Sequence, residues 1–212
     1  MFALVLAAAF AALSQWQLGR SVSTGTVVTR NTETVVPLDS VAKPQKPMTD
    51  RANAQLVSAT GSWVPGDYVL VSDRLNKGVA GYWVVGHFSA DQRGGKPVGL
   101  VVALGWSPNR VGAASALKAL PGSQPTGTVT VSGRYFPSEG PQDGDFQKGA
   151  LSTISPGAMI NLWKDTDPAG VYAGYLVSAD APKTLTTIDS PRPTSDVELN
   201  LLNVFYAIEW VV

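Results

Sequence analysis

The chain has 212 residues, 16 basic and 16 acidic side chains, one His and no Cys. Apolar and aromatic residues make up 44% of it, with 21 Gly and 15 Pro, which suits one domain of short strands and many turns and excludes a disordered protein. The balanced charge excludes a basic nucleic-acid surface, the absence of Cys excludes disulfides and thiolate sites, and one His with three scattered Met excludes an ordinary copper or zinc site.

The N-terminal segment predicts an uncleaved membrane anchor. Residues 1–18 carry no charge, and as a helix they would rise about 27 Å, close to the thickness of a bilayer core. The alternative is a secretory signal peptide, which starts with Lys or Arg and ends in small residues at a cleavage site. Here no basic residue precedes Arg20, and Trp16 stands where cleavage would fall. We therefore expect a transmembrane helix over residues 1–20.

The middle of the chain predicts a mainly β domain outside the membrane, over residues 55–198. Residues 21–54 are polar and contain several Pro, and indicate a connector with one short strand at 25–30. Beyond them, segments rich in Val, Tyr, Trp and Thr and bounded by turn formers predict strands at 55–63, 67–74, 80–88, 97–106, 126–135, 170–178 and 183–188. This spacing is typical of an antiparallel barrel or sandwich. The expected core includes Val57, Val69, Val71, Val84, Val101, Trp106, Val129 and Val131.

Two stretches interrupt the strand pattern. Residues 113–120 are helix formers followed by Pro121, which predicts a short connecting helix that stops there. Residues 137–169 concentrate turn formers around a short element at 157–163, and predict a long loop. The carboxylates of this loop lack the spacing of a calcium site, so we expect no metal at Asp143, Asp145, Asp165 and Asp167.

Two short segments of the domain are similar to each other. SATGSWVP at 58–65 and TVSGRYFP at 130–137 each hold a Gly, an aromatic residue two positions later, and a Pro. We interpret both as strands in which the Gly marks a bulge and the Pro ends the ladder.

The C-terminal segment predicts the start of a second membrane helix, over residues 199–212. Asp196 and Glu198 suit a helix N-terminus, and an apolar run follows them. Its last thirteen residues rise only about 20 Å, which is too short to span, so we expect the native chain to continue past Val212.

The order of motifs along the chain resembles a known family. The first helix ends in Trp16-Gln17-x-x-Arg20, and the last segment contains Tyr206-Ala207-x-x-Trp210. Between them lie GSWVPGDYVLVSDR at 61–74, GYWVV at 81–85 and GWSP at 105–108. In this order the motifs are similar to those of bacterial members of the Surfeit locus protein family of cytochrome c oxidase assembly factors.

The resemblance implies a membrane-anchored assembly factor for a haem-copper oxidase, with its β domain on the outer side of the bacterial plasma membrane. The alternative is a constitutive accessory subunit of a respiratory oxidase or supercomplex that serves only for packing. In both cases the partners are oxidase subunits and the lipid bilayer. A third possibility is a secreted β domain, which leaves the returning helix unexplained. The chain has no nucleophile elbow, Walker loop or dinucleotide fingerprint, so we expect no enzyme.

One departure from the family pattern concerns the cofactor. The family places a His three residues before the Tyr of the returning helix, as the favoured haem ligand, and this chain has Asn203 there. An amide is not an axial ligand for haem iron. We therefore expect no cofactor through this helix, which leaves His87 and Tyr206 as the candidate ligands. The residues expected at the partner or membrane interface are Trp16, Gln17, Arg20, Asn203, Tyr206 and Trp210.

The functional candidates each have a plainer alternative. The aromatic pairs near the membrane surface form either a slot for a flat group or an aromatic belt, and Glu209 is either functional or interfacial. His87 follows a strand, as a ligand or base, or simply as an exposed or hydrogen-bonded side chain. Arg74 and Arg134 form ion pairs or headgroup contacts, or recognise a partner.

Overall fold

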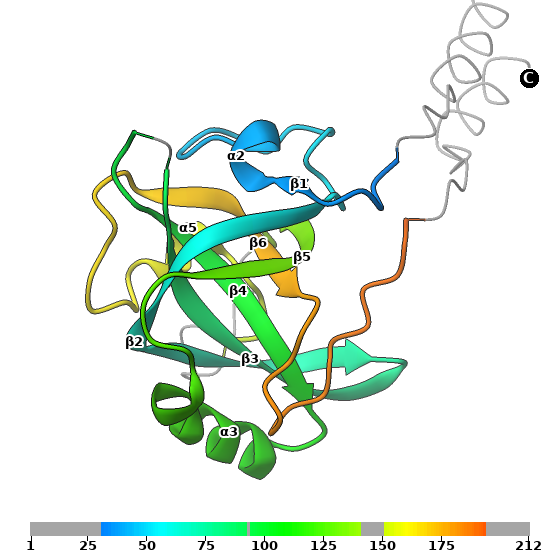
Figure 1. The fold of residues 1–212 in the computed structure, drawn as a ribbon. Helices are drawn as coiled ribbons and strands as arrows, with labels where there is room; N and C mark the ends of the chain where they lie inside the picture. The colour runs from blue at the N-terminus through cyan, green and yellow to red at the C-terminus, as the bar shows by residue number, and fades with distance from the viewer. Residues whose placement is uncertain (1–30, 93, 141–150, 194–212) are drawn as a thin grey trace, which may run out of the picture. The chain divides into compact units, whose positions relative to one another are not determined.

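The computed structural model describes residues 31–92, 94–140 and 151–193 (Figure 1). Nearly all of them belong to one compact unit, Thr32–Arg192. The second unit, Met1–Asn31 with Pro193–Val212, lies outside the described residues except at positions 31 and 193, and so do the expected anchor, the connector strand and the returning helix. Among the described residues, no helix is both long and apolar enough to cross a membrane.

The unit is mainly β, as the sequence predicts, and its strands form one mixed sheet with short helices around it (Figure 1). In chain order the elements are β1 (Val36–Pro37), α2 (Leu38–Val41), β2 (Leu56–Asn76), β3 (Val79–Ala90), β4 (Val98–Ser107), α3 (Arg110–Ser123), β5 (Val129–Pro137), α5 (Pro156–Met159) and β6 (Val171–Ser178). Part of the stretch expected to be a connector therefore carries β1 and α2, and Leu38 of α2 is buried in the core.

The first two expected strands are one long strand, β2. Its pairing with β3 shifts register between Trp63 and Tyr68, where Pro65 and Gly66 interrupt the pattern, and Gly66 has a φ of +91°. The strand continues because Pro65 lies at this irregularity, where the ladder already lacks a pair.

A two-residue turn joins β2 to β3. Asn76 pairs with Val79 across it, and the two central residues, Lys77 and Gly78, have φ values of 50° and 81°. Positive φ at both central positions matches the right-handed twist of a hairpin.

The strand pairings form a closed circuit. β2 pairs with β3, β3 with β4, β4 with β6, β6 with β5, and β5 returns to β2. Every pair in this circuit is antiparallel except β4 with β6. A closed circuit of five strands cannot alternate in direction all the way round, so at least one pair must be parallel. The expectation of a purely antiparallel sheet is therefore wrong.

The last expected strand, at 183–188, is also wrong. Only one isolated bridge forms there, between Trp106 and Thr186. Beyond this bridge, the segment pairs with no strand of the described residues and instead bonds to the side chain of Asn76. Asn76 donates from Nδ2 to the carbonyl of Thr187 and accepts at Oδ1 from the amide of Asp189.

The helices lie close to their expected places. α3 begins after Asn109, whose side chain accepts from the amide of Gly112 at 2.9 Å, an N-cap contact. It does not stop at Pro121 but includes it in its last turn, where the missing N–H leaves a single ladder bond unmade. α5 lies at the short element expected in the long loop.

Most of the expected core is buried. Val57, Val71, Val84 and Val101 are fully enclosed, and Trp106 is 9% exposed. The other three, Val69, Val129 and Val131, are half-buried and pack at the margins of the core clusters.

Candidate functional site

The only His of the chain is buried inside the unit between two carboxylates. His87 lies on β3 with 1% of its side chain exposed. Its Nδ1 is 3.1 Å from Oδ2 of Asp67, and its Nε2 is 2.6 Å from Oδ2 of Asp167. Asp67 comes from β2, where Tyr68 pairs with Gly86 and so brings Asp67 beside His87. Asp167 comes from the loop before β6.

Further contacts fix each member of this Asp67–His87–Asp167 cluster. The imidazole stacks on Trp163 with ring centroids 3.6 Å apart and planes 4° from parallel. The amide of Lys164 donates to Oδ1 of Asp67 at 3.1 Å, and the hydroxyl of Ser89 donates to Oδ1 of Asp167.

A glycine makes room for the cluster. A Cβ on Gly99 of β4 would lie 3.1 Å from Oδ2 of Asp167 and 3.3 Å from Nε2 of His87. It would also lie 3.0 Å from the ring of Trp163, so any larger residue would press on all three side chains.

The cluster requires one proton in each of its two imidazole–carboxylate contacts. Either an imidazolium faces two carboxylates, or a neutral imidazole faces one carboxylate and one protonated carboxyl group. Both states carry one net negative charge. Both ring nitrogens are occupied, so His87 has no lone pair free for a metal, a haem iron or a substrate proton while the cluster is closed. The sequence analysis left open whether His87 is an exposed or a hydrogen-bonded side chain. In the structure it is hydrogen-bonded and buried.

Arg74 forms a second, half-buried network. Its guanidinium donates to both carboxylate oxygens of Glu139, at 2.6 and 2.8 Å, and lies 4.1 Å from the ring centre of Trp83. The hydroxyl of Tyr175 and the amide of Ile154 also donate to Glu139, at 2.7 and 2.9 Å. Such a bidentate pair holds the loop after β5 against β2 and β6.

The protonation of this network follows from its contacts. Burial favours the neutral acid and would raise the pKa of Glu139, but the hydrogen bonds from Arg74, Tyr175 and the Ile154 amide outweigh it, so the pKa is lowered. The pKa of Tyr175 is raised, first by burial and then by its bond to Glu139.

Arg134 connects the two ends of the compact unit. Its Nη1 and Nη2 donate to the carboxylate of Glu33 at 3.0 and 3.1 Å. Its Nε donates to the carbonyl of Ser190 at 3.0 Å, and Nη1 also donates to the carbonyl of Ala54 at 2.8 Å. The guanidinium therefore binds residues near the start and the end of the unit at once.

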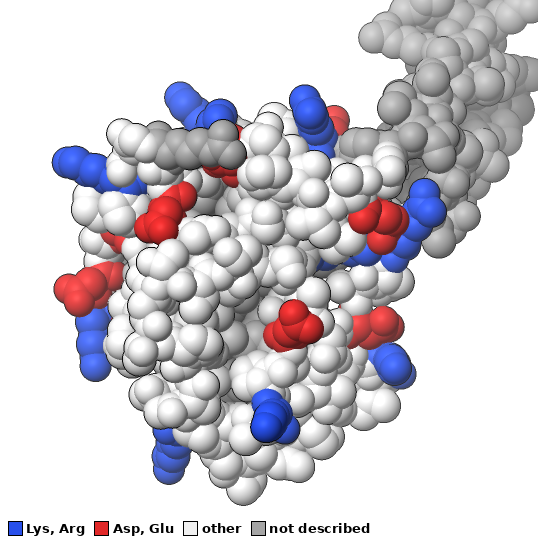
Figure 2. Space-filling view, in the orientation of Figure 1, with Lys and Arg blue, Asp and Glu red and all other residues white. Residues whose placement is uncertain are grey.

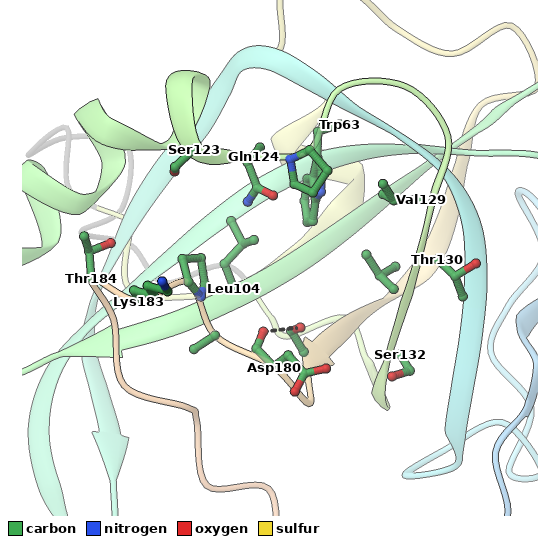
Figure 3. A pocket seen from close by; sticks show the side chains of 15 residues that line it. Trp63, Leu104, Ser123, Gln124, Val129, Thr130, Ser132, Asp180, Lys183 and Thr184 are labelled. Carbon is green, nitrogen blue, oxygen red and sulfur yellow. Dashed lines mark hydrogen bonds between the residues drawn. The ribbon is translucent and has the colours of Figure 1, made fainter.

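One groove opens on the surface beside β5 (Figure 3). It has a volume of about 620 Å³, and Trp63 and Leu104 form its apolar floor. Exposed polar side chains stand around it, including one acid, Asp180, and one base, Lys183. The groove thus combines an apolar floor with a polar rim of no net charge.

On one face of the unit, the charges do not gather into a binding surface of one sign. On the face in Figure 2, basic side chains are scattered among acidic ones. Within the described ranges, no group of three or more His, Cys, Asp or Glu side chains is placed to hold a metal ion.

The interface residues predicted from the sequence cannot be placed. Trp16, Gln17, Arg20, Asn203, Tyr206 and Trp210, together with Glu209, lie outside the described residues. Among the candidates that the structure describes, it brings none together: His87, Arg74 and Arg134 belong to three separate networks.

The sequence analysis missed the partners of His87. Asp167 is treated there as a turn residue, and Asp67 and Trp163 are not singled out. One signal was available: Asp67 and His87 are polar residues inside strands, and a polar group inside a strand needs a partner.

A comparison with protein families finds a match over nearly the whole chain. The sequence model of the SURF1 family matches residues 4–212. No curated protein matches the chain.

Proposed function

The chain belongs to the SURF1 family, and from that membership we propose that it is a membrane-anchored assembly factor for a haem-copper cytochrome c oxidase. The family is associated with cytochrome oxidase assembly. One observation carries the proposal: the match runs from residue 4 to residue 212, so it includes the apolar segments at both ends as well as the β unit. In this proposal the two apolar segments hold the β unit at the outer side of a bacterial plasma membrane.

The internal contacts of the candidate residues are consistent with a factor that acts by binding. Their most chemically rich cluster, Asp67–His87–Asp167, is closed by its own hydrogen bonds and by the stacked Trp163. Arg74 and Arg134 likewise form ion pairs with Glu139 and Glu33 of the same unit. The proposed factor therefore acts by contact with oxidase subunits.

A second candidate function is a constitutive accessory subunit of the oxidase or of its supercomplex. The observation that favours it is Asn203, which stands where the family has its favoured haem-ligating His. A chain without that ligand still has two apolar segments and a β unit for packing.

An affinity pull-down of the full chain tests the proposal. A tagged copy is expressed in the cells that make the protein and purified in mild detergent, with the untagged chain as control. We expect oxidase subunits in the eluate, and lower oxidase haem content and activity when the gene is deleted. If the subunits are absent from the eluate and deletion changes neither property, both candidate functions fail.

The same preparation separates the two candidates. An assembly factor is expected on immature oxidase and in less than stoichiometric amount on the active enzyme. An accessory subunit is expected in fixed stoichiometry with active oxidase, measured by quantitative mass spectrometry of the purified enzyme.

A further inference from the structure

The groove beside β5 lies against the edge of a strand. Four consecutive residues of β5 line it: Val129, Thr130, Val131 and Ser132. Successive side chains of a strand point to opposite faces, so a groove against one face would be lined by every second residue only. The lining by all four therefore indicates that the backbone edge forms this wall, and Figure 3 shows β5 along one side of the groove.

The pairing of β5 shows which backbone groups face the groove. The amide of Tyr135 donates to the carbonyl of Gln55, and its carbonyl accepts from Ala54, so the backbone of Tyr135 points toward β2. Backbone groups alternate in direction along a strand, and the β2–β5 register has no shift, so the N–H and C=O of Thr130 point away from β2. The close pairing of the Thr130 and Thr60 hydroxyls, 3.0 Å apart, agrees with that register.

Among the described residues, no other strand pairs with this part of the edge. β6 pairs with β5 only from Gly133 onward, and the last contact is the Ala179 amide to the Ser132 carbonyl. In the described part of the chain, the N–H and C=O of Thr130 have no hydrogen-bond partner. The uncovered edge runs over Val129–Val131 and spans roughly 10 Å.

We propose that this groove receives an extended peptide segment of an oxidase subunit, which adds as a strand to the free edge of β5. An exposed strand edge is a template for an added strand, because the main-chain groups give affinity and the neighbouring pockets give specificity. The apolar floor of Trp63 and Leu104 would take a large apolar side chain of the segment, and the rim of Asp180 and Lys183 selects neither sign of charge. The identity of the partner rests on the proposed function, whereas strand addition follows from the groove itself.

Site-specific photocrosslinking in the full chain tests the proposal. A benzoylphenylalanine is placed at Gln124 or at Lys183, two groove positions, and in a control at Val111, which is 77% exposed on α3 and does not line the groove. After irradiation of cells, tagged protein is purified and the cross-linked peptide is identified by mass spectrometry. We expect both groove positions to join the same short segment of one oxidase subunit, and the control position not to join it.

A matched pair of variants tests the backbone contact. Thr130→Pro and Thr130→Ala both remove the hydroxyl contact to Thr60, but only Pro removes the N–H that faces the groove. The β2 ladder does not use that N–H, so both variants should fold, which is checked by thermal unfolding. We expect cross-linking to fall about tenfold in Thr130→Pro, because the loss of one backbone hydrogen bond lowers affinity by about that factor. In Thr130→Ala, which keeps the N–H, we expect a fall of less than about twofold.

A second variant covers the case in which Thr130→Pro unfolds. Thr184→Trp places a large ring on the opposite wall of the groove and leaves β5 intact. We expect it to reduce cross-linking from Gln124 about tenfold, while Val111→Trp leaves that cross-linking unchanged.

The outcomes separate this proposal from the proposed function. If the oxidase co-purifies but the groove positions give no cross-link to it, the groove assignment is overturned and the proposed function stands. Equal cross-linking in Thr130→Pro and Thr130→Ala would overturn strand addition. A cross-link to this chain itself, to a second copy or to a protein outside the oxidase would overturn the assignment of the occupant.

Discussion

At the scale of single residues, the Asp67–His87–Asp167 cluster is the most consequential feature of the unit. It encloses three ionisable side chains that are at most 8% exposed. Buried charges are tolerated only when they are paired and hydrogen-bonded, and removing one partner leaves the others uncompensated. The cluster is therefore a point where one substitution has a large effect on stability.

We predict that His87→Gln lowers the free energy of unfolding by about 3–5 kcal/mol, because it removes the imidazole that hydrogen-bonds both buried carboxyl groups and leaves their negative charge without that partner. Urea unfolding of the full chain in mild detergent measures this change. In the triple variant that adds Asp67→Asn and Asp167→Asn, part of the loss should be regained, since the uncompensated charges are gone. A loss below about 1 kcal/mol in the single variant would show that the cluster does not stabilise the fold.

Glu139 gives the unit a predictable response to acid. Its pKa in the folded protein lies below the ordinary value of 4.5, so its stabilising effect is complete above pH 4.5 and is lost as the pH falls through the lowered value. We predict that Glu139→Gln costs about 1–3 kcal/mol near pH 7 and that the difference from the native chain shrinks as the pH is lowered below 4.5. Unfolding measured between pH 7 and pH 3 checks this. The control is Asp180→Asn, at an exposed acid outside this network, measured over the same pH range.

At the scale of elements, two glycines allow the strand circuit to close. Gly61 pairs with Ala90 of β3 and with Val129 of β5, and Gly133 pairs with Val57 of β2 and with Ser178 of β6. Each glycine thus stands where one strand is paired on both sides. Neither lies at a register shift, so the bulges expected at these positions are wrong, and close backbone approach explains the glycines instead.

We predict that Gly133→Ala destabilises the unit by more than about 3 kcal/mol. A Cβ at this position would lie 2.0 Å from the carbonyl oxygen of Val177, a backbone atom that cannot move without breaking the β5–β6 ladder. The matched control is Gly122→Ala in α3, where nothing lies within 4 Å, and a gain of up to about 1 kcal/mol is expected from helix propensity. Thermal unfolding of the two variants compares them. Similar melting temperatures for both would contradict the explanation.

The strands were predictable because each is marked locally. Val, Tyr and Trp runs between turn formers locate β3, β4, β5 and β6 to within a few residues. The continuity of β2 was not predictable, because Pro65 and Gly66 read as a turn and only the pairing with β3 shows a register shift. The segment at 183–188 has strand composition, but the Asn76 side chain takes the place of a partner strand.

The candidate site was far less predictable than the strands. His87 is visible as the only His, yet its partners lie 20 and 80 positions away and come from different elements. No local pattern encodes such a contact. The groove depends in the same way on the point where β6 stops pairing with β5, which is a property of the assembled sheet.

At the scale of the whole molecule, the strand circuit explains why the expected sheet type was wrong. Alternating strands along the chain predict antiparallel neighbours, but the sequence does not state how many strands the circuit holds. β6 inserts between β4 and β5, which makes the number odd and requires at least one parallel pair; here that pair is β4–β6. Local composition is enough to predict the fold class, whereas the direction of neighbouring strands depends on how many strands the closed circuit contains.

For the full chain we predict that no haem co-purifies in stoichiometric amount. The family resemblance implies a haem-ligating His at position 203, where this chain has Asn, and His87 is held by Asp67 and Asp167. Optical spectroscopy of the purified protein checks this, with Asn203→His as the comparison variant. A haem band in the native chain that disappears in Asn203→Ala would contradict the prediction.

Arg134 hydrogen-bonds both Glu33, near the start of the unit, and Ser190, near its end. The two ends of the unit therefore lie close together. Chain ends held so close can be covalently joined by a short flexible linker at little entropic cost. New ends could then be opened at the exposed turn between α3 and β5, where Gly127 has a φ of 86° and a Cβ would meet no atom within 4 Å. The β unit is therefore suited to circular permutation and to insertion as a cassette into a loop of another protein.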